Sequence, residues 1–250
     1  MTGQPLLEIR HLRKTFGGLV ATNDVSLAVR PGETLALIGP NGAGKTTLIA
    51  QLQGELSPSA GTILFRGRDI THAPPHRRAL LGLARSFQIT AVLPDFTALE
   101  NVRLAVQARS GHSFRFWRSA AGDPSLDGPA GAALDEAGLG ARKAIRADAL
   151  SHGERRQLEL AIALAMKPAL LLLDEPMAGI GRQDAAAMTA LLRALKKTYG
   201  IVLVEHDMDA VFALADRIAV LVAGTVIAVG TPEAVRADPA VRAAYLGHKQ

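Results

Sequence analysis

A run of three glycines, one lysine and two threonines fills residues 39–47, between an apolar run and a helical pattern. Its form, Gly-x4-Gly-Lys-Thr, is typical of a loop that cradles phosphates, because glycines let successive backbone N–H groups point at phosphate oxygens. The helix that follows adds the partial positive charge of its N-terminus. We expect Lys45 to bridge the β- and γ-phosphates of a nucleotide and the Thr46 hydroxyl to bind Mg²⁺. The residues expected at the nucleotide are Gly39, Asn41, Gly42, Ala43, Gly44, Lys45, Thr46 and Thr47.

The alternative for this loop is a glycine-rich turn that only caps a helix. A second candidate group makes the nucleotide interpretation stronger. Two adjacent carboxylates, Asp174 and Glu175, follow four consecutive leucines. Side chains alternate along a strand, so the two carboxylates cannot share one direction unless the chain turns there. We expect Asp174 to hold Mg²⁺ through water and Glu175 to act as the base that polarises the attacking water. The alternative is a strand that ends in solvated acids.

A histidine closes the next expected strand, residues 201–205. Ligands of open α/β sheets bind at the carboxyl ends of the strands, which is where His206 and the acid pair would lie. A neutral imidazole at His206 could hydrogen-bond the γ-phosphate or position Glu175, although a lone histidine at a strand end is usually structural. The catalytic candidates are therefore Lys45, Glu175 and His206.

The elements that must position these groups follow from periodicity and turn residues. Strands are expected at residues 6–12, 25–29, 35–38, 61–65, 169–173, 201–204 and 218–222. Helices are expected at residues 45–52, 97–109, 133–139 and 154–166, and around the amphipathic repeat 188–195. Residues 110–132, rich in Gly, Pro, Ser and Asp, are expected to form a loop. The pattern predicts an α/β fold with a parallel core interrupted by a mostly helical insert of about 80 residues.

Composition sets limits on the class of protein. The chain has 250 residues, 48% of them apolar and 20% charged, so it can bury a core and is globular. Its net charge of +5 is compatible with nucleic acid, an anionic membrane face or phosphorylated ligands, and does not choose among them. It has no cysteine, which excludes disulfides and thiolate zinc sites. No run approaches the roughly 20 apolar residues of a membrane helix, so a membrane role requires a partner.

Residues 150–176 resemble the signature motif and Walker B region of the ATP-binding cassette (ABC) proteins. Six motifs occur along the chain in the order of that family. Phe16 resembles the aromatic residue that stacks on adenine. Gln88 resembles the glutamine that joins the core to the helical insert, and the resemblance assigns it to the nucleotide and metal sites. Ser151, Gly153 and Glu154 fall at the signature, and His206 falls at the switch histidine.

The resemblance implies a P-loop NTPase core with a parallel sheet, a small antiparallel β subdomain and a helical insert subdomain, which is the ABC ATPase fold. It implies a single domain over residues 1–250, with the catalytic core in 1–88 and 167–250 and the helical subdomain in 89–166. It also implies ATP and Mg²⁺ as cofactors. Two identical or paralogous subunits would pack head to tail, so that Ser151 and Gly153 of one subunit cap the γ-phosphate held by the other.

Residues 16–21, 204–208 and 244–247 resemble the ATPase subunits of branched-chain amino acid importers, as does the insert with its aromatic cluster at 114–118. That resemblance implies integral membrane permease subunits, a periplasmic solute-binding protein acting indirectly, and a peripheral location on the cytoplasmic face of the inner membrane. Related importers carry urea, amides or aromatic acids, so the substrate stays open. Alternatives are an ABC exporter ATPase, or a soluble ABC ATPase acting on ribosomes or nucleic acid. With one cassette and a short insert, no nucleic-acid partner is expected.

The chain departs from the common family pattern at three positions. His152 stands where glycine is commonest, and Glu154 where glutamine is usual. Gly181 stands where Asp or Asn often contacts the opposite subunit. Variation at the first two positions is tolerated in amino-acid importer subunits.

Overall fold

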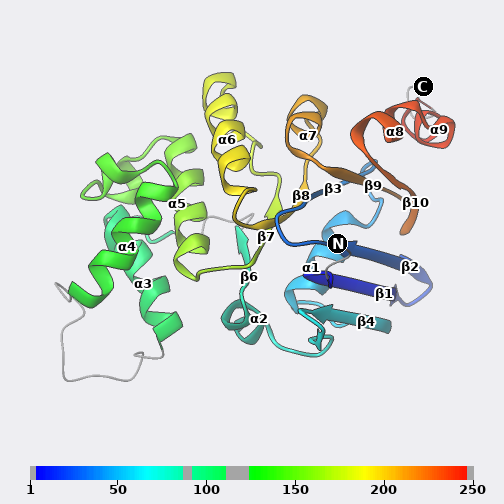
Figure 1. The fold of residues 1–250 in the computed structure, drawn as a ribbon, viewed down its shortest axis with the longest axis horizontal. Helices are drawn as coiled ribbons and strands as arrows, with labels where there is room; N and C mark the ends of the chain where they lie inside the picture. The colour runs from blue at the N-terminus through cyan, green and yellow to red at the C-terminus, as the bar shows by residue number, and fades with distance from the viewer. Residues whose placement is uncertain (1–3, 87–91, 111–123, 247–250) are drawn as a thin grey trace.

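The computed structural model describes residues 4–86, 92–110 and 124–246 (Figure 1). A six-stranded sheet forms its centre, with the strand order β10-β9-β3-β8-β7-β6. The strands are β3 (Thr34–Ile38), β6 (Leu83–Ser86), β7 (Leu170–Asp174), β8 (Gly200–Val204), β9 (Arg217–Val222) and β10 (Thr225–Gly230). All neighbours pair in parallel except β9 and β10. Every residue of β3, β7 and β8 is buried, as expected for central parallel strands covered on both faces.

A second, antiparallel sheet has the strand order β2-β1-β4-β5. Its strands are β1 (Leu7–Phe16), β2 (Leu19–Val29), β4 (Ala60–Phe65) and β5 (Arg68–Asp69). In Figure 1 this smaller sheet lies beside α1 (Lys45–Gln53), the helix that follows the glycine-rich loop. One apolar cluster joins the inner faces of both sheets and includes Leu48, Ile49 and Leu52 of α1. The helix is therefore held between the two sheets.

The remaining helices lie around the larger sheet. In Figure 1, α3 (Ala98–Ser110), α4 (Pro124–Glu136) and α5 (His152–Ala165) lie together at one end of the molecule. Toward the other end come α6 (Arg182–Leu195), α7 (Met208–Leu214), α8 (Pro232–Ala237) and α9 (Pro239–Leu246). The short helix α2 (Pro75–Leu81) precedes β6, and two 3₁₀ turns, Gly140–Arg142 and Ala147–Ala149, precede α5.

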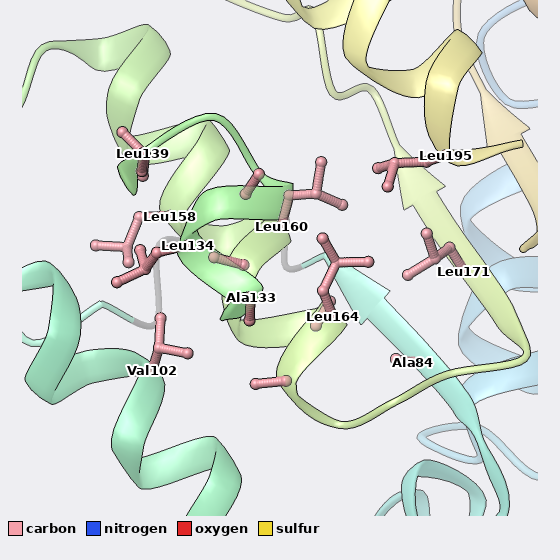
Figure 2. Packing of buried hydrophobic residues seen from close by; sticks show 14 of the residues in the cluster. Ala84, Val102, Ala133, Leu134, Leu139, Leu158, Leu160, Leu164, Leu171 and Leu195 are labelled. Atoms are coloured by element: carbon pink, nitrogen blue, oxygen red, sulfur yellow. The ribbon is translucent and has the colours of Figure 1, made fainter. Parts of the chain in front are cut away.

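The three helices at the end of the molecule share one apolar core with the sheet. Figure 2 shows Leu160 and Leu164 of α5 facing Leu171 of β7 and Leu195 of α6, with Leu134 on the other side of α5. Packing is thus continuous from the helical segment into the central sheet. Its division from the core at residues 88 and 166 stays a prediction, and position 88 lies outside the described residues.

The fold prediction is confirmed in its main features, with one clear error. The stretch expected to be a loop, 110–132, contains most of α4 within its described part, 124–132. Leu126, Ala130, Ala133 and Leu134 recur at helical spacing and are buried in the shared core. Pro124 stands at the start of the helix, where proline is tolerated, so tertiary packing outweighs the weak helix propensity of the stretch.

Several short elements gave too little periodicity to be predicted: β6, β10, α2, α7, α8 and α9. Within the described ranges, no helix combines the length and apolar character needed to cross a bilayer.

Candidate functional site

The glycine-rich loop joins β3 to α1, as predicted. Its glycines are required by space as well as by conformation. A Cβ on Gly39 would collide with the carbonyl oxygen of Leu221, and one on Gly44 would collide with that of Ala21. Gly44 also has a φ of +100°, in the left-handed region that favours glycine. The loop is therefore pressed against neighbouring backbone, with no room for a side chain at either glycine.

The first turn of α1 is open to an anion. Gly44 occupies the N-cap position and provides no side-chain cap, and the turn carries no acidic residue. Its backbone N–H groups therefore lack the side-chain acceptor that most helices place there. Thr46 is exposed in this turn, Asn41 and Gly42 are exposed in the loop, and Ala43 is buried beneath it. This arrangement suits a phosphate group.

Lys45 curls back over the loop. Its Nζ donates to the carbonyl oxygens of Gly39 at 2.6 Å and of Pro40 at 3.1 Å. Burial lowers the pKa of Lys45, while the nearby carboxylates of Glu175 and Asp174 raise it. The structure thus brings the lysine and the acid pair, about 130 positions apart in sequence, close enough for their charges to interact.

The acid pair ends β7, and the chain turns there. Asp174 is 3% exposed, whereas the Glu175 side chain is 37% exposed. Glu175 has a φ of +50°, a left-handed conformation that is strained for a non-glycine residue, and its N–H donates to Val204 of β8 at 2.8 Å. This turn breaks the strand alternation that would otherwise send the two carboxylates in opposite directions. Burial raises the pKa of Asp174, Arg85 lowers it, and Glu175 raises it.

Arg85 is a contact that the sequence analysis missed. It lies on β6, and its Nη2 donates to Oδ2 of Asp174 at 3.4 Å. Its Nη1 donates to Oε1 of Gln53 at 2.5 Å and reaches the carboxylate of Glu55 at 3.2 Å. In the sequence, a lone arginine three residues before Gln88 was the only sign of this contact. Its partners could not be predicted, because they are remote in sequence.

His206 lies beside Glu175 without a direct hydrogen bond. Its Nδ1 is 3.8 Å from Oε1 of Glu175, and the imidazole is 71% exposed. The backbone around it is fixed by Glu205, which is buried and was also missed. The Glu205 carboxylate accepts from the N–H groups of Met177 at 2.9 Å and His206 at 3.0 Å. One carboxylate thereby ties together the loops that follow β7 and β8.

The signature segment begins α5. Ser151 is the N-cap, and its hydroxyl accepts from the N–H of Glu154, whose carboxylate accepts in return from the N–H of Ser151. Glu154 is paired with Arg142 at 2.7 Å. The Ser151 side chain is exposed, and Gly153 is buried. Among the described residues, no hydrogen bond or ion pair joins residues 151–154 to the phosphate loop.

The surroundings of the signature and of the departure His152 are defined by close contacts at neighbouring glycines. A Cβ on Gly153 would meet the carboxylate of Asp184 on α6, and one on Gly179 would lie 3.3 Å from Nε2 of His152. The imidazole of His152 therefore packs closely against Gly179, on the segment that follows the acid pair. Gly181 has open space around it and forms the N-cap of α6.

Of two further residues expected to contact the nucleotide, the structure describes Phe16 but not Gln88. Phe16 ends β1 with its ring 48% exposed, and Nζ of Lys14 lies 5.2 Å from the ring centre. The ring is therefore accessible to a base. Gln88 and the aromatic cluster 114–118 lie outside the described residues.

The described residues contain no group of three His, Asp or Glu side chains able to hold a metal ion by themselves. Mg²⁺ commonly keeps several waters and takes only one or two carboxylates together with substrate phosphates. The exposed Thr46 hydroxyl and the Asp174 carboxylate fit such a mixed set of oxygen ligands, with the loop supplying the phosphate site.

Comparison with known proteins identifies the family. The family model described as "ABC transporter" matches residues 22–178. The chain belongs to this family. A second model, described as "Branched-chain amino acid ATP-binding cassette transporter", matches residues 225–249. The resemblance inferred from the motifs is therefore confirmed, and the chain is the ATP-binding subunit of an ABC transporter, with ATPase activity.

Individual relatives cover the whole chain. It is 38% identical over 256 residues to the "High-affinity branched-chain amino acid transport ATP-binding protein LivG" of Escherichia coli (strain K12), with 98% of both chains covered. It is 36% identical over 251 residues to "High-affinity branched-chain amino acid transport ATP-binding protein BraF" of Pseudomonas aeruginosa, with the same coverage.

Solved structures of ABC transporter cassettes match the fold. A cassette in its ADP conformation gives a TM-score of 0.87 at 28% identity, covering 98% of this chain and 100% of that one. A nucleotide-free cassette gives 0.85 at 28% identity, covering 97% and 99%. The ABC ATPase fold, with its mixed sheet, antiparallel β sheet and helices, is therefore confirmed.

Proposed function

We propose that this chain hydrolyses ATP to power the import of branched-chain or closely related amino acids. The observation that carries the proposal is the 38% identity to LivG across 98% of both chains. The match of residues 225–249 to the branched-chain transporter model supports it independently at the C-terminal end.

The proposed assembly contains two ATPase subunits, identical or paralogous, and integral membrane permease subunits, with a periplasmic solute-binding protein delivering the substrate. The chain would lie on the cytoplasmic face of the inner membrane. The exposed Ser151 hydroxyl at the start of α5 supports the dimer, because it is free to donate to a γ-phosphate bound to another subunit. Gly153 and Glu154 would complete that contact.

Within one subunit we assign roles by proximity and chemistry. Lys45 would neutralise the β- and γ-phosphates, with the loop N–H groups around them. Thr46 and Asp174 would hold Mg²⁺, which supplies charge neutralisation at the phosphates when bound, and Gln88 would join them. The loop residues in this role are Gly39, Asn41, Gly42, Ala43, Gly44 and Thr47.

Catalysis would depend on Glu175 as the general base for the attacking water. The partial exposure of its carboxylate, on a turn directly after Asp174, supports this role. His206, 3.8 Å away, would orient that carboxylate or bond the γ-phosphate. Phe16 would stack on adenine with its exposed ring.

The test is reconstitution of the chain with the permease and binding-protein subunits that co-purify with it. Proteoliposomes with ATP inside and the binding protein outside should accumulate labelled leucine, and urea or an aromatic acid should compete poorly. Efflux of leucine, or ATP-driven uptake of urea alone, would contradict the proposed substrate and direction. ATP hydrolysis stimulated by ribosomes or nucleic acid, without binding to any permease, would support the soluble alternative.

A further inference from the structure

Arg85 joins side chains from two different elements next to the proposed nucleotide site. On one side it contacts Asp174 at the end of β7, and on the other it contacts Gln53 and Glu55, at and just beyond the C-terminal end of α1. The side chain is only 14% exposed. An arginine in this place links the helix that carries the phosphate loop to the carboxylate proposed to hold the metal.

The strand register explains how Arg85 reaches Asp174. β6 and β7 pair in parallel, with Arg85 opposite Leu172. Leu83 on β6 and Leu170 and Leu172 on β7 all face the apolar cluster that contains α1. Arg85 and Asp174 continue these alternating rows, so both side chains extend from the face of the sheet that α1 covers.

We propose that Arg85 is a positioning residue that fixes the Asp174 carboxylate for Mg²⁺, using the end of α1 as its anchor. This inference rests on the proposed function of the site. The planar guanidinium is suited to the task, because its two terminal nitrogens can bond different partners at once in a fixed geometry. One nitrogen contacts Oδ2 of Asp174, which leaves Oδ1 available to a water of the metal.

The charge of Arg85 opposes a nearby cation, so its net effect needs to be weighed. Glu55 lies 3.2 Å from the same guanidinium and offsets that charge. Together Arg85, Glu55 and Asp174 carry a net charge of −1. This net charge favours the binding of a divalent cation. Partners that orient a metal ligand from behind typically contribute about 10–100-fold to metal affinity. Positioning therefore outweighs repulsion.

The experiment compares the full-length protein with Arg85→Met and Arg85→Lys. Binding of a non-hydrolysable ATP analogue is measured by calorimetry across a Mg²⁺ series and again in excess EDTA. Arg85→Met should raise the Mg²⁺ concentration for half-maximal enhancement of binding about tenfold. Affinity for the metal-free analogue should stay within about twofold, and Arg85→Lys should recover part of the loss because it keeps one donor.

Arg103→Met is the matched control. Arg103 is 16% exposed and pairs with Asp127, which links α3 to α4. Its loss removes an ion pair of similar burial without touching the nucleotide site, so the Mg²⁺ midpoint should not move. Glu55→Gln is a milder probe, since Glu55 is 45% exposed, and it should shift the midpoint in the same direction as Arg85→Met. It keeps the proposal testable if Arg85→Met folds poorly.

Three outcomes would overturn the proposal. An equal loss of affinity with and without Mg²⁺ would make Arg85 a purely structural residue. An unchanged midpoint would remove it from the site, and a lowered midpoint would mean that repulsion dominates. Failure of the proposed function is a separate result: in that case the unaltered protein would bind the analogue with no Mg²⁺ dependence, or Asp174→Asn would leave that dependence intact.

Discussion

Arg78 is a deeply buried charged residue, 1% exposed, and its removal gives a quantitative test of the packing around the phosphate-loop helix. Its guanidinium donates to four backbone carbonyl oxygens, those of Gln51, Leu52, Thr71 and Ala73, at 2.7–2.9 Å. The first two belong to the last turn of α1. Arg78 therefore supplies donors to the C-terminal end of the helix whose N-terminus carries Lys45.

The expected loss for Arg78→Met follows from these bonds. Four hydrogen bonds at about 1 kcal/mol each amount to about 4 kcal/mol of unfolding free energy. Burial of the guanidinium opposes this and lowers the pKa of Arg78 to about 10, still far enough above neutrality that the group stays charged. Methionine removes that desolvation penalty, which offsets much of the loss, but it also leaves the carbonyl oxygens without these donors, so we expect a net loss of about 3 kcal/mol.

For a domain of this size, each kcal/mol corresponds to about 2–4 °C in Tm, so Arg78→Met should melt roughly 6–12 °C lower by calorimetry. The control is Arg77→Met on the same helix, where the side chain is exposed and the change should stay within about 0.5 kcal/mol. An Arg78→Met protein as stable as the unaltered chain would refute the reasoning, since it would mean that desolvation cancels all four hydrogen bonds.

Three further predictions concern the nucleotide site and the signature. Lys45→Ala should abolish tight ATP binding, because the phosphates lose their main counterion, and unchanged affinity by calorimetry would refute it. Glu175→Gln should retain ATP binding but nearly stop turnover and trap an ATP-bound dimer, visible by size-exclusion chromatography; normal hydrolysis would remove Glu175 from the role of base. In Glu154→Gln, the decrease in unfolding free energy from neutral to low pH should be smaller than in the unaltered protein. The hydrogen bond from the Ser151 N–H lowers the pKa of Glu154, as does Arg142, so this carboxylate stabilises the protein at neutral pH and loses that effect as the pH falls through its lowered pKa. Identical acid-unfolding curves for the two proteins would contradict this.

The parts of the site that could be predicted from sequence are those with a local cause. The phosphate loop is specified by glycines, a lysine and a threonine within nine positions, and the two acids by their place after four leucines. Central strands such as β7 and β8 were equally clear, because a short, wholly apolar run has few other uses in a soluble domain.

The contacts that were missed depend on how the fold buries charged residues. Arg78 and Glu205 are buried and Arg85 is largely covered, and a sequence pattern gives no sign that a charge will lose its exposure. The separation between Arg85 and Asp174 is 89 positions. The α4 helix was missed for the opposite reason, since its Gly and Pro content suggests a loop and only packing against α3 and α5 makes it helical.

The left-handed backbone at Glu175 sets two requirements of the protein against each other. A glycine at that position would adopt φ +50° more easily, by about 1 kcal/mol, and would lose the carboxylate. A screen that rewards only resistance to heat would therefore favour a variant without the proposed general base. Thermostable variants selected without an uptake assay should be sequenced at this codon first.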